Sequence, residues 1–481
     1  MTALLHRIGG DSDWSDLFCG AGGATSGLIL SGHKVKAAYN HWQTAIDTHQ
    51  ANHPDTIHQC VDINHYDMRR LPRTRFLWAS VICTEASPAG GKRRSRGQIE
   101  LVLDEDGERV ADEAFERTRA CALDVIRATE VHRYDAIVVE NVVEFSTDWE
   151  LFDWWRKGMA ILGYQSRVFS MSAAHVGGVG NDPAAQWRDR IIILFVRNGL
   201  PMVDLTPSPL AWCQECDREV ESVQSWRNGR TIGKYRQQYD YRCPSSSCRN
   251  ALVEPYVLPA ETVIDWTNLG TRIADRPMRE FFKGKGANKH SLGFHRLAPD
   301  TLSKIGRALT EYADWCELIL VTTTHGGDDP RALPARLAPL PTRTAKIGDG
   351  FVTPPGAAII EQRGGGSLYR PVTHPLSTLG TSRNHGLVIP YRKGSGKPTS
   401  EPLLTLATRD SAGIVRPSYE VDDCMYRMLQ PREALSAQRF DQAYIVRGTK
   451  GEQTMQAGNA VPVNLSQFIG RRIAETLDGA A

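Results

Sequence analysis

Hydrophobic and polar positions alternate in two different ways along the chain, and the pattern changes near residue 198. Before that point short apolar runs, such as AIVV (136–139) and IIILFV (191–196), alternate with helical patterns such as TSGLILSG (25–32). Continuously apolar runs are typical of strands covered on both faces, as in a parallel sheet flanked by helices. The first part of the chain therefore predicts a doubly wound α/β domain.

Residues 198–424 have a different texture, rich in Pro, Gly, Thr and Arg, with short strand-like runs and many turn signals. An imperfect repeat occurs there at 338–352, 374–388 and 401–415. Each copy has Pro-Leu-x-Thr near its start and ends in Gly, an apolar residue and Val. Three copies at unequal spacing are too few for a solenoid. We expect either a β-rich module with Thr and Arg at its turns or a fold that reuses one hairpin. Helical patterning returns after about residue 426.

Composition narrows the class of protein only a little. The chain has 481 residues, of which 41% are hydrophobic and 23% charged, as in a globular protein of two or three domains. No run approaches the roughly 18 uninterrupted apolar residues of a membrane helix, and the N-terminus does not resemble a signal peptide, so we expect a cytoplasmic protein with no membrane partner. The net charge of +2 neither demands nor excludes nucleic acid.

The segment DLFCGAGG (16–23) joins a strand-like entry to a helical pattern. Glycines at 20, 22 and 23 let the backbone turn sharply and approach a ligand, and the following helix offers free N–H groups. A plain tight turn between strand and helix would look the same. An aromatic residue in the turn, Phe18, and an acidic residue after a later strand, Asp62, are the companions expected of a nucleoside pocket.

Cys83 ends another apolar run and begins a loop, in VICTEASPAGGKRR (81–94). A free cysteine is most often a core residue. The alternative is a nucleophile held toward an anionic substrate, with the basic residues behind it favouring the thiolate.

Five motifs together resemble the DNA cytosine-5 methyltransferase family in order and approximate position. They are DLFCGAGG, the Cys83 loop, VVENV (138–142), QWRDR (186–190) and QAGNAVP (456–462). RMLQPREALSAQRF (427–440) also looks like that family's penultimate motif. The resemblance covers both ends of the chain, and the middle is where that family carries its variable target-recognition domain.

The resemblance implies a reaction and the residues that perform it. Cys83 would add to C6 of a flipped cytosine, so that C5 takes a methyl group from S-adenosylmethionine. Glu140 would hydrogen-bond the base at N3 and at its amino group. Arg190 would reach the base O2 or the Glu140 carboxylate, and Arg188 would brace the same pocket. The alternatives are a rim carboxylate at 140 and a solvated strand edge at 188 and 190.

The resemblance also implies a class I S-adenosylmethionine-dependent methyltransferase fold, Rossmann-like with a mostly parallel sheet. The cofactor residues are expected to be Phe18, Gly20, Gly22, Gly23, His41, Trp42, Asp62, Asn459 and Val461.

The sequence departs from the family at two places. Ile82 and Thr84 stand where the family usually has proline and glutamine, on either side of the nucleophile. His41 stands where it has an acidic residue that binds the ribose hydroxyls, and a histidine cannot accept two such hydrogen bonds. Either the ribose contact is redistributed, or the enzyme uses a modified S-adenosylmethionine and transfers a larger group, for example carboxymethyl. We expect methyl transfer.

Four of the ten cysteines form two pairs in the middle of the chain, within 212–250. Without a secretory signal, cysteines are better explained by free thiols and a metal site than by disulfides. Two paired thiolates on tight turns can build a tetrahedral zinc site, which with four protein ligands would be structural. Four unconnected thiols are the alternative. The ligands expected for zinc are Cys213, Cys216, Cys243 and Cys248.

Between the two cysteine pairs, residues 226–242 carry five basic side chains and one acidic one, interleaved with Trp226, Tyr235, Tyr239 and Tyr241. Such a ribbon can contact phosphates through its cations and bases through its rings. The alternative is a solvated hairpin whose aromatic residues form its own small core. A second basic stretch at 281–296 favours a surface that faces DNA.

The leading hypothesis is therefore a DNA (cytosine-5)-methyltransferase that acts on double-stranded DNA. We expect a catalytic and cofactor-binding domain (1–197), a β-rich target-recognition domain with a zinc ribbon (198–424), and a C-terminal segment that returns to the first domain (425–481). We expect a monomer, and a restriction endonuclease partner stays open. The alternatives are an RNA cytosine methyltransferase, which the long insertion disfavours, and a DNA-binding relative without catalysis, which the joint presence of Cys83, Glu140, Arg188 and Arg190 disfavours.

Overall fold

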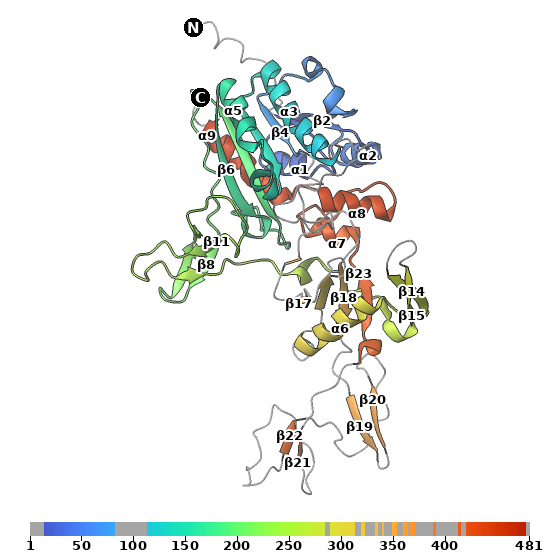
Figure 1. The fold of residues 1–481 in the computed structure, drawn as a ribbon. Coiled ribbons are helices and arrows are strands. Elements are labelled where there is room, and N and C mark those ends of the chain that lie inside the picture. The colour runs from blue at the N-terminus through green and yellow to red at the C-terminus, as the bar shows by residue number, and fades with distance from the viewer. Residues whose placement is uncertain are drawn as a thin grey trace, which may run out of the picture. The chain divides into compact units, whose positions relative to one another are not determined.

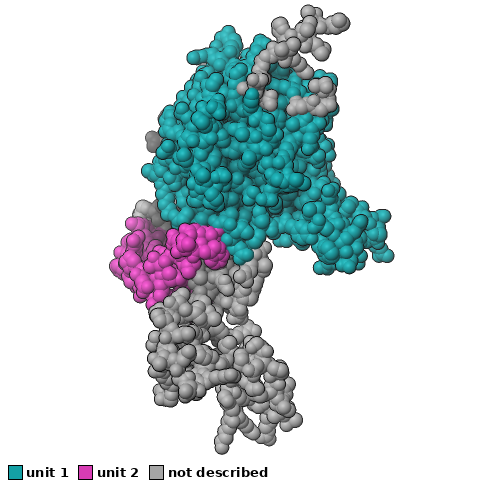
Figure 2. All heavy atoms as spheres, turned by 180° about the vertical axis from the view of Figure 1, so that it is seen from behind, with its two compact units in different colours: residues 1–263, 338–347, 430–481 teal, residues 264–337, 348–429 magenta. Residues whose placement is uncertain are grey.

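The chain forms two compact units in the computed structural model (Figure 2). The first comprises residues 1–263, 338–347 and 430–481, and the second comprises 264–337 and 348–429. The structure describes residues 14–81, 113–283, 289–312, 319–322, 332–334, 339–340, 349–353, 359–363, 366–370, 388–390, 412–414 and 420–477.

The first unit is built on a seven-stranded sheet with the order β3-β2-β1-β4-β5-β7-β6 (Figure 1). From β3 across to β5 all neighbours are parallel, whereas β7 is antiparallel to both β5 and β6. The strands are β1 (Trp14–Leu17), β2 (Val35–Asn40), β3 (Ile57–Cys60), β4 (Phe76–Ala79), β5 (Ala136–Asn141), β6 (Tyr164–Ser172) and β7 (Asp189–Arg197). This mostly parallel sheet is that of a class I methyltransferase. The chain order reverses between β1 and β4, which is where ligands bind in open α/β sheets.

Helices cover both faces of this sheet, as the apolar runs predict. Along β4, Leu77 and Ala79 join one core with helices α3 and α5, while Phe76 and Trp78 join the other core with α1 and α9. Strand β7 contains the run 191–196 and is antiparallel, yet it is buried on both faces. Its apolar pattern therefore indicates that both faces are buried, and it does not indicate whether the strand is parallel or antiparallel. The helices are α1 (Gly23–Leu30), α2 (Gln43–Asn52), α3 (Glu113–His132), α4 (Glu144–Thr147), α5 (Phe152–Ile161), α7 (Pro431–Ser436), α8 (Lys450–Asn459) and α9 (Val463–Leu477).

The C-terminal helices complete the first unit by packing on its N-terminal half. Helices α1 and α9 approach so closely that a Cβ built on Gly27 would lie 2.0 Å from Ser466 Oγ and 2.3 Å from the Val463 carbonyl oxygen. Asn464 Nδ2 also donates to the carbonyls of Ala173 and Val176 at 2.9 and 2.8 Å. The last segment of the chain is thus held both by glycine-permitted packing and by buried hydrogen bonds.

The segment with the two cysteine pairs, here called the cysteine ribbon (residues 210–254), also belongs to the first unit. Two small sheets build it, β8 with β9 and the order β10-β11-β12. The chain enters the second unit only at residue 264. The bounds are β8 (Leu210–Cys213), β9 (Arg218–Glu221), β10 (Val223–Trp226), β11 (Tyr239–Arg242) and β12 (Leu252–Val253).

The second unit is β-rich. Its largest sheet has the order β13-β23-β18-β16-β17, and Ile305 and Leu309 of helix α6 share a core with Ile273 and Tyr426. Each repeat copy ends in strand residues, and the ends of the second and third copies pair with each other as β21 and β22; most of the rest of the repeats lies outside the described residues. The bounds are α6 (Pro299–Tyr312), β13 (Thr271–Arg272), β14 (Arg279–Lys283), β15 (His290–His295), β16 (Ile319–Thr322), β17 (Ala332–Pro334), β18 (Asp349–Thr353), β19 (Ile359–Arg363), β20 (Gly366–Arg370), β21 (Val388–Pro390), β22 (Ala412–Ile414) and β23 (Met425–Met428).

Within the described ranges, no helix has both the length and the apolar character needed to span a membrane.

Candidate active site

A buried ion pair lies where β5 and β7 run side by side. Arg190 Nε lies 2.7 Å from Glu140 Oε1, and the two side chains are only 8% and 9% exposed. Arg190 also donates from Nη1 to the carbonyl of Asp189 at 2.8 Å. The structure therefore brings together one residue from VVENV and one from QWRDR. A buried pair is costly to desolvate, so it is a stronger pointer to a functional site than to stability.

The residue after Glu140 holds the start of the segment that leads to Cys83. Asn141 Nδ2 donates to the carbonyl oxygen of Val81 at 3.2 Å, and its Oδ1 accepts from the backbone N–H of Val142 at 2.8 Å. Cys83 itself, with Ile82 and Thr84, lies outside the described residues. The last described position before it, Val81, is thus fixed beside the carboxyl end of β5.

Arg188 binds the QAGNAVP segment. Its side chain is buried, and Nη2 donates to the carbonyls of Gly458 and Ala460 at 3.0 and 2.7 Å. Arg188 and Arg190 come from the same motif but hold different partners. The first ties β7 to the C-terminal segment, and the second holds Glu140.

The glycine turn after β1 has the backbone conformation that its sequence predicts. Phe18, Gly20 and Gly22 all have positive φ, at 61°, 52° and 92°. A Cβ on Gly23 would lie 1.9 Å from the carbonyl oxygen of Val461, so only glycine allows this approach. Positive φ at a residue other than glycine, as at Phe18, is a strain that functional sites tend to keep. Gly23 and Val461, distant in sequence, lie against each other.

The other expected cofactor residues lie at the ends of the neighbouring strands. His41 follows β2 and is exposed, and the backbone N–H of Trp42 donates to Asn40 Oδ1 at 2.9 Å. Asp62 follows β3, accepts from the backbone N–H of Asn64 at 3.0 Å, and keeps a side chain that is 52% exposed. Asn459 ends helix α8 and is exposed. Polar groups that follow β2 and β3, and one at the end of α8, are therefore exposed.

A buried polar chain connects β1, α1, α2 and β3, and sequence reasoning missed it. Thr25 Oγ1 donates to Asp16 Oδ2 at 2.8 Å, His49 Nε2 lies 3.0 Å from Thr25 Oγ1, and His49 Nδ1 lies 2.7 Å from His58 Nε2. Because the Thr25 proton is used on Asp16, we assign the His49 proton to Nε2, so that Nδ1 accepts from His58. The sequence feature that could have indicated this chain is the presence of three histidines close together, at positions 49, 53 and 58.

Burial sets the charge state of this chain. It raises the pKa of Asp16 to about 7, although the hydrogen bond from Thr25 opposes the shift. It also lowers the pKa of His49 well below its usual value, with the charges of His53 and His58 acting in the same direction. The histidines are therefore neutral near pH 7, as the hydrogen-bond chain requires.

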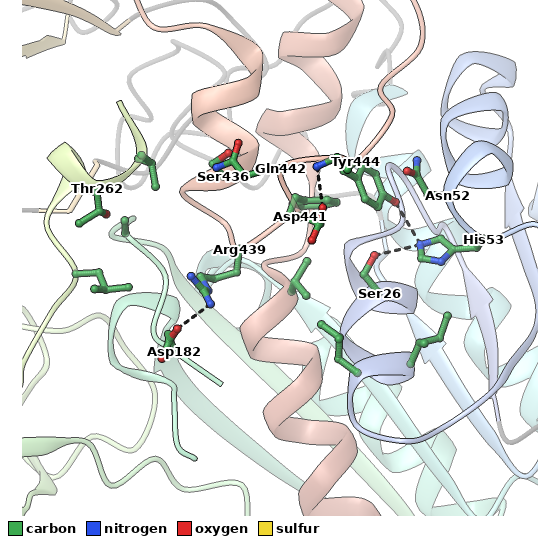
Figure 3. Close-up of a pocket in the computed structure, with 18 of the residues that line it drawn as sticks. Ser26, Asn52, His53, Asp182, Thr262, Ser436, Arg439, Asp441, Gln442 and Tyr444 are labelled. Carbon is green, nitrogen blue, oxygen red and sulfur yellow. Dashed lines mark hydrogen bonds and ion pairs between the residues drawn. The ribbon is translucent and has the colours of Figure 1, made fainter. Parts of the chain in front are cut away.

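His53 lies at the edge of a cavity of about 950 Å³ (Figure 3). Its Nε2 is 3.1 Å from Ser26 Oγ and 3.3 Å from the Tyr444 hydroxyl, and the Asp182–Arg439 ion pair also lines the cavity. Of the expected catalytic, cofactor and metal residues that the structure describes, none lines this cavity. We therefore place the candidate active site at Glu140 and the glycine turn and not in this cavity.

The four cysteines of the cysteine ribbon come together. Their sulfur atoms all lie within 4.8 Å of one another, with Cys213 and Cys248 at 3.9 Å and Cys216 and Cys243 at 4.0 Å. With Zn–S bonds of about 2.3 Å, tetrahedral geometry separates the sulfurs by about 3.8 Å. The donor set and its spacing fit zinc.

Three tyrosines of the cysteine ribbon lie in its core. Tyr239 and Tyr241 are fully buried and Tyr235 is 7% exposed, and all three pack with Cys213 and Cys243. Of the two expectations for residues 226–242, the structure supports the hairpin with its own small core.

Comparisons with known proteins show what this chain is similar to. A model of the C-5 cytosine-specific DNA methylase family matches residues 13–238 and 364–475, well over half of the chain. The Type II methyltransferase M.AgeI of Thalassovita gelatinovora is 22% identical over 96% of this chain and 98% of its own length. M.HgiDI of Herpetosiphon aurantiacus is 30% identical over 18% of this chain and 30% of its own. The solved structure of Dnmt2 methyltransferase from S. pombe aligns with 97% of this chain and 99% of its own, at 11% identity and a TM-score of 0.46.

The buried histidines predict a loss of stability in acid. Burial, reinforced by the charge of His58, lowers the pKa of His53 to about 4. The unfolded chain binds a proton near pH 6.5 and the folded chain does not, so stability is lost as pH falls from about 6.5 to 4. For His53 alone this amounts to about 1.5–2 kcal/mol between pH 7 and pH 5.

His53→Gln should therefore reduce the pH dependence of the free energy of unfolding, measured by urea titration at pH 7 and pH 5. The control His65→Gln, at an exposed position, should leave that dependence as in the wild type. Equal pH dependence in His53→Gln and the wild type would contradict the assignment.

Proposed function

The chain belongs to the C-5 cytosine-specific DNA methylase family, and we propose that Cys83, Glu140 and Arg190 carry its reaction. The protein is a DNA cytosine-5 methyltransferase, and its substrate class is double-stranded DNA. The buried Glu140–Arg190 ion pair is the main support for assigning these residues. Next to it, Asn141 binds Val81, two residues before Cys83.

The proposed reaction begins with a cytosine flipped out of the duplex, because C5 and C6 are not accessible from both sides within stacked DNA. The Cys83 thiolate forms a bond to C6, which makes C5 electron-rich. S-adenosylmethionine supplies the methyl group that C5 takes. Loss of the C5 proton and of the Cys83 sulfur from C6 then restores the double bond and frees the thiolate.

Glu140 is proposed to bind the base edge at N3 and at the amino group. Attack at C6 moves electron density onto N3, so a protonated Glu140 carboxyl group that donates its proton to N3 would stabilise the transition state more than the ground state. The 2.7 Å contact to Arg190 supports this role, because it fixes the carboxylate in one orientation. The Arg190 guanidinium has five N–H donors, so one of them would be available to bind the base O2.

The cofactor is proposed to lie over the glycine turn at the ends of β1, β2 and β3. The support is the sharp backbone turn with positive φ at Phe18, Gly20 and Gly22, open space beside Gly20, and the half-exposed carboxylate of Asp62. Phe18 and Trp42 would contact the adenosine, and Asn459 and Val461 its methionine end. His41 would accept only one hydrogen bond from the ribose hydroxyls, because a neutral imidazole has one acceptor nitrogen. The carboxylate of Asp62 would accept the other. We propose the ordinary cofactor and methyl transfer.

The inserted residues 198–424 are proposed to read the DNA sequence, while 1–197 and 425–481 carry the chemistry. We also propose that the cysteine ribbon holds one structural zinc through Cys213, Cys216, Cys243 and Cys248, because the sulfur spacing suits a closed tetrahedral site. Two relatives are named Type II methyltransferases, and by that likeness we propose a place in restriction–modification, which would keep the protein in the cytoplasm.

Cys83→Ala should abolish methyl transfer and leave DNA binding, because only the covalent step is removed. Mass spectrometry of nucleosides from DNA incubated with the protein and S-adenosylmethionine should show 5-methylcytosine with the wild type and none with the variant. A gel-shift titration of the same preparations checks binding. Persistent 5-methylcytosine in the variant would rule out Cys83 as the nucleophile.

Glu140→Gln should lower the single-turnover rate of methyl transfer roughly 10²-fold or more, in the range of a lost acid–base group. Glu130→Gln provides the matched control, since Glu130 is exposed on α3. Similar single-turnover rates of methyl transfer in the two variants would contradict the proposed role of Glu140.

The purified protein should contain one zinc per chain by elemental mass spectrometry after dialysis. Cys216→Ser should reduce that content strongly, because three thiolates bind the ion far more weakly than four. Cys60→Ser, which changes an exposed cysteine outside the cluster, should retain it. Zinc-free wild-type protein that is folded and active would contradict the metal site.

A further inference from the structure

We infer that the cysteine ribbon positions the Glu140–Arg190 pair, so that Lys234 and its neighbours act in the methylation step without touching DNA. The inference rests on the proposed catalytic role of that pair. It gives the cysteine ribbon a function inside the catalytic unit, where it supports the ends of two strands that carry the proposed catalytic residues.

Three consecutive residues of the cysteine ribbon bind three different elements of the first unit. The backbone N–H of Gly233 donates to Ser170 Oγ at 3.1 Å, Lys234 Nζ lies 2.5 Å from Glu144 Oε1, and the backbone N–H of Tyr235 donates to Asp189 Oδ1 at 3.3 Å. A fourth contact runs from Gln224 Nε2 to the Ser170 carbonyl at 2.8 Å. This loop is therefore fastened to β6, to the start of α4 and to β7.

The three anchor points surround the catalytic pair. Asp189 directly precedes Arg190 on β7, and Glu144 comes four residues after Glu140, at the start of α4. Ser170 is paired with Ile191 across the β6–β7 ladder. Each partner of the Glu140–Arg190 pair thus has a ribbon contact close to it in sequence.

The contacts are shielded from solvent, which makes them stronger positioning elements than surface ion pairs. The Lys234 and Glu144 side chains are 26% and 15% exposed. Burial raises the pKa of Asp189 to about 6, against the lowering effects of the Tyr235 N–H and the Lys234 charge. The cysteine ribbon therefore favours the charged form of the carboxylate next to Arg190.

The same loop is continuous with the four-cysteine site. Tyr235 packs with Cys213 and Cys243 in the core of the ribbon, and its ring stacks on that of Trp187 at 5.9 Å between centroids. Trp187 belongs to the QWRDR motif. A single small core therefore joins the cysteines to the motif that carries Arg190.

A phosphate contact is the competing role for a basic ribbon residue, and the two roles have different kinetic signatures. A positioning residue changes the rate of the chemical step at saturating DNA. A phosphate contact instead changes DNA affinity and lowers the slope of its salt dependence.

The test compares Lys234→Met with Arg218→Met in the full-length protein, each removing one cation from the ribbon. Arg218 is exposed on β9, outside the sheet contacts. Lys234→Met should lower the single-turnover methylation rate at saturating DNA and S-adenosylmethionine roughly 10-fold or more, as small misplacements of catalytic groups do. Its DNA affinity, salt slope and zinc content should stay near those of the wild type, and Arg218→Met should keep the wild-type single-turnover rate at saturating DNA.

Glu144→Gln and the double variant complete the design. Because the two side chains act on each other, the double variant should lose little more activity than Lys234→Met alone. A wild-type rate in Lys234→Met, or a change confined to DNA affinity and salt slope, would overturn the inference. If the wild-type protein itself forms no 5-methylcytosine, the proposed function fails instead, so the two failures are distinguishable.

Discussion

The close packing of the C-terminal segment on the glycine turn and helix α1 is the constraint on which the candidate site depends. It brings Val461 against Gly23, at a separation that no Cβ would allow, and places α9 directly on Gly27. Buried hydrogen bonds hold the same contact, among them the Tyr444 hydroxyl donating to the Ala21 carbonyl at 2.5 Å and Ser466 Oγ donating to the Gly23 carbonyl at 3.0 Å. Without it, the motifs at the two ends of the chain would not form one site. Arg188 extends the arrangement, because it links QAGNAVP to the strand that carries Arg190.

Sequence patterns predicted those parts of the structure that depend on local burial or on a motif. The apolar runs at 136–139 and 191–196 are strands, and Glu140 and Arg190 meet as their motifs imply. Strand direction was not predictable, since a strand covered on both faces is apolar whether it is parallel or antiparallel. The catalytic geometry of Cys83 stays a prediction, because the residue lies outside the described part of the chain.

Long-range packing explains what the sequence did not reveal. The cysteine pairs indicated a zinc site, but nothing in their spacing shows that the ribbon packs within the first unit or that Lys234 reaches Glu144, 90 residues away in sequence. The aromatic residues between the cysteines were open to two explanations, and burial of Tyr239 and Tyr241 decided between them. The histidine chain was also hidden, because His49 and His58 meet only when α2 packs beside β3.

The two buried polar groups of the first unit show why support from the cysteine ribbon matters. The histidines in the polar chain from Asp16 to His58 are neutral near pH 7. Their hydrogen bonds hold the side chains in fixed orientations. The Glu140–Arg190 pair is instead a close ion pair at the end of the β5–β7 ladder, whose last paired residues are Asn141 and Ile191. Strand pairing holds the backbone, since Glu140 pairs with Ile192 and Arg190 with Met171, but a carboxylate that binds a base must also keep its side-chain orientation to within a fraction of an ångström. Contacts from Gly233, Lys234 and Tyr235 support the residues around the pair from outside the ladder, and Tyr235 joins this loop to the core that contains Cys213 and Cys243.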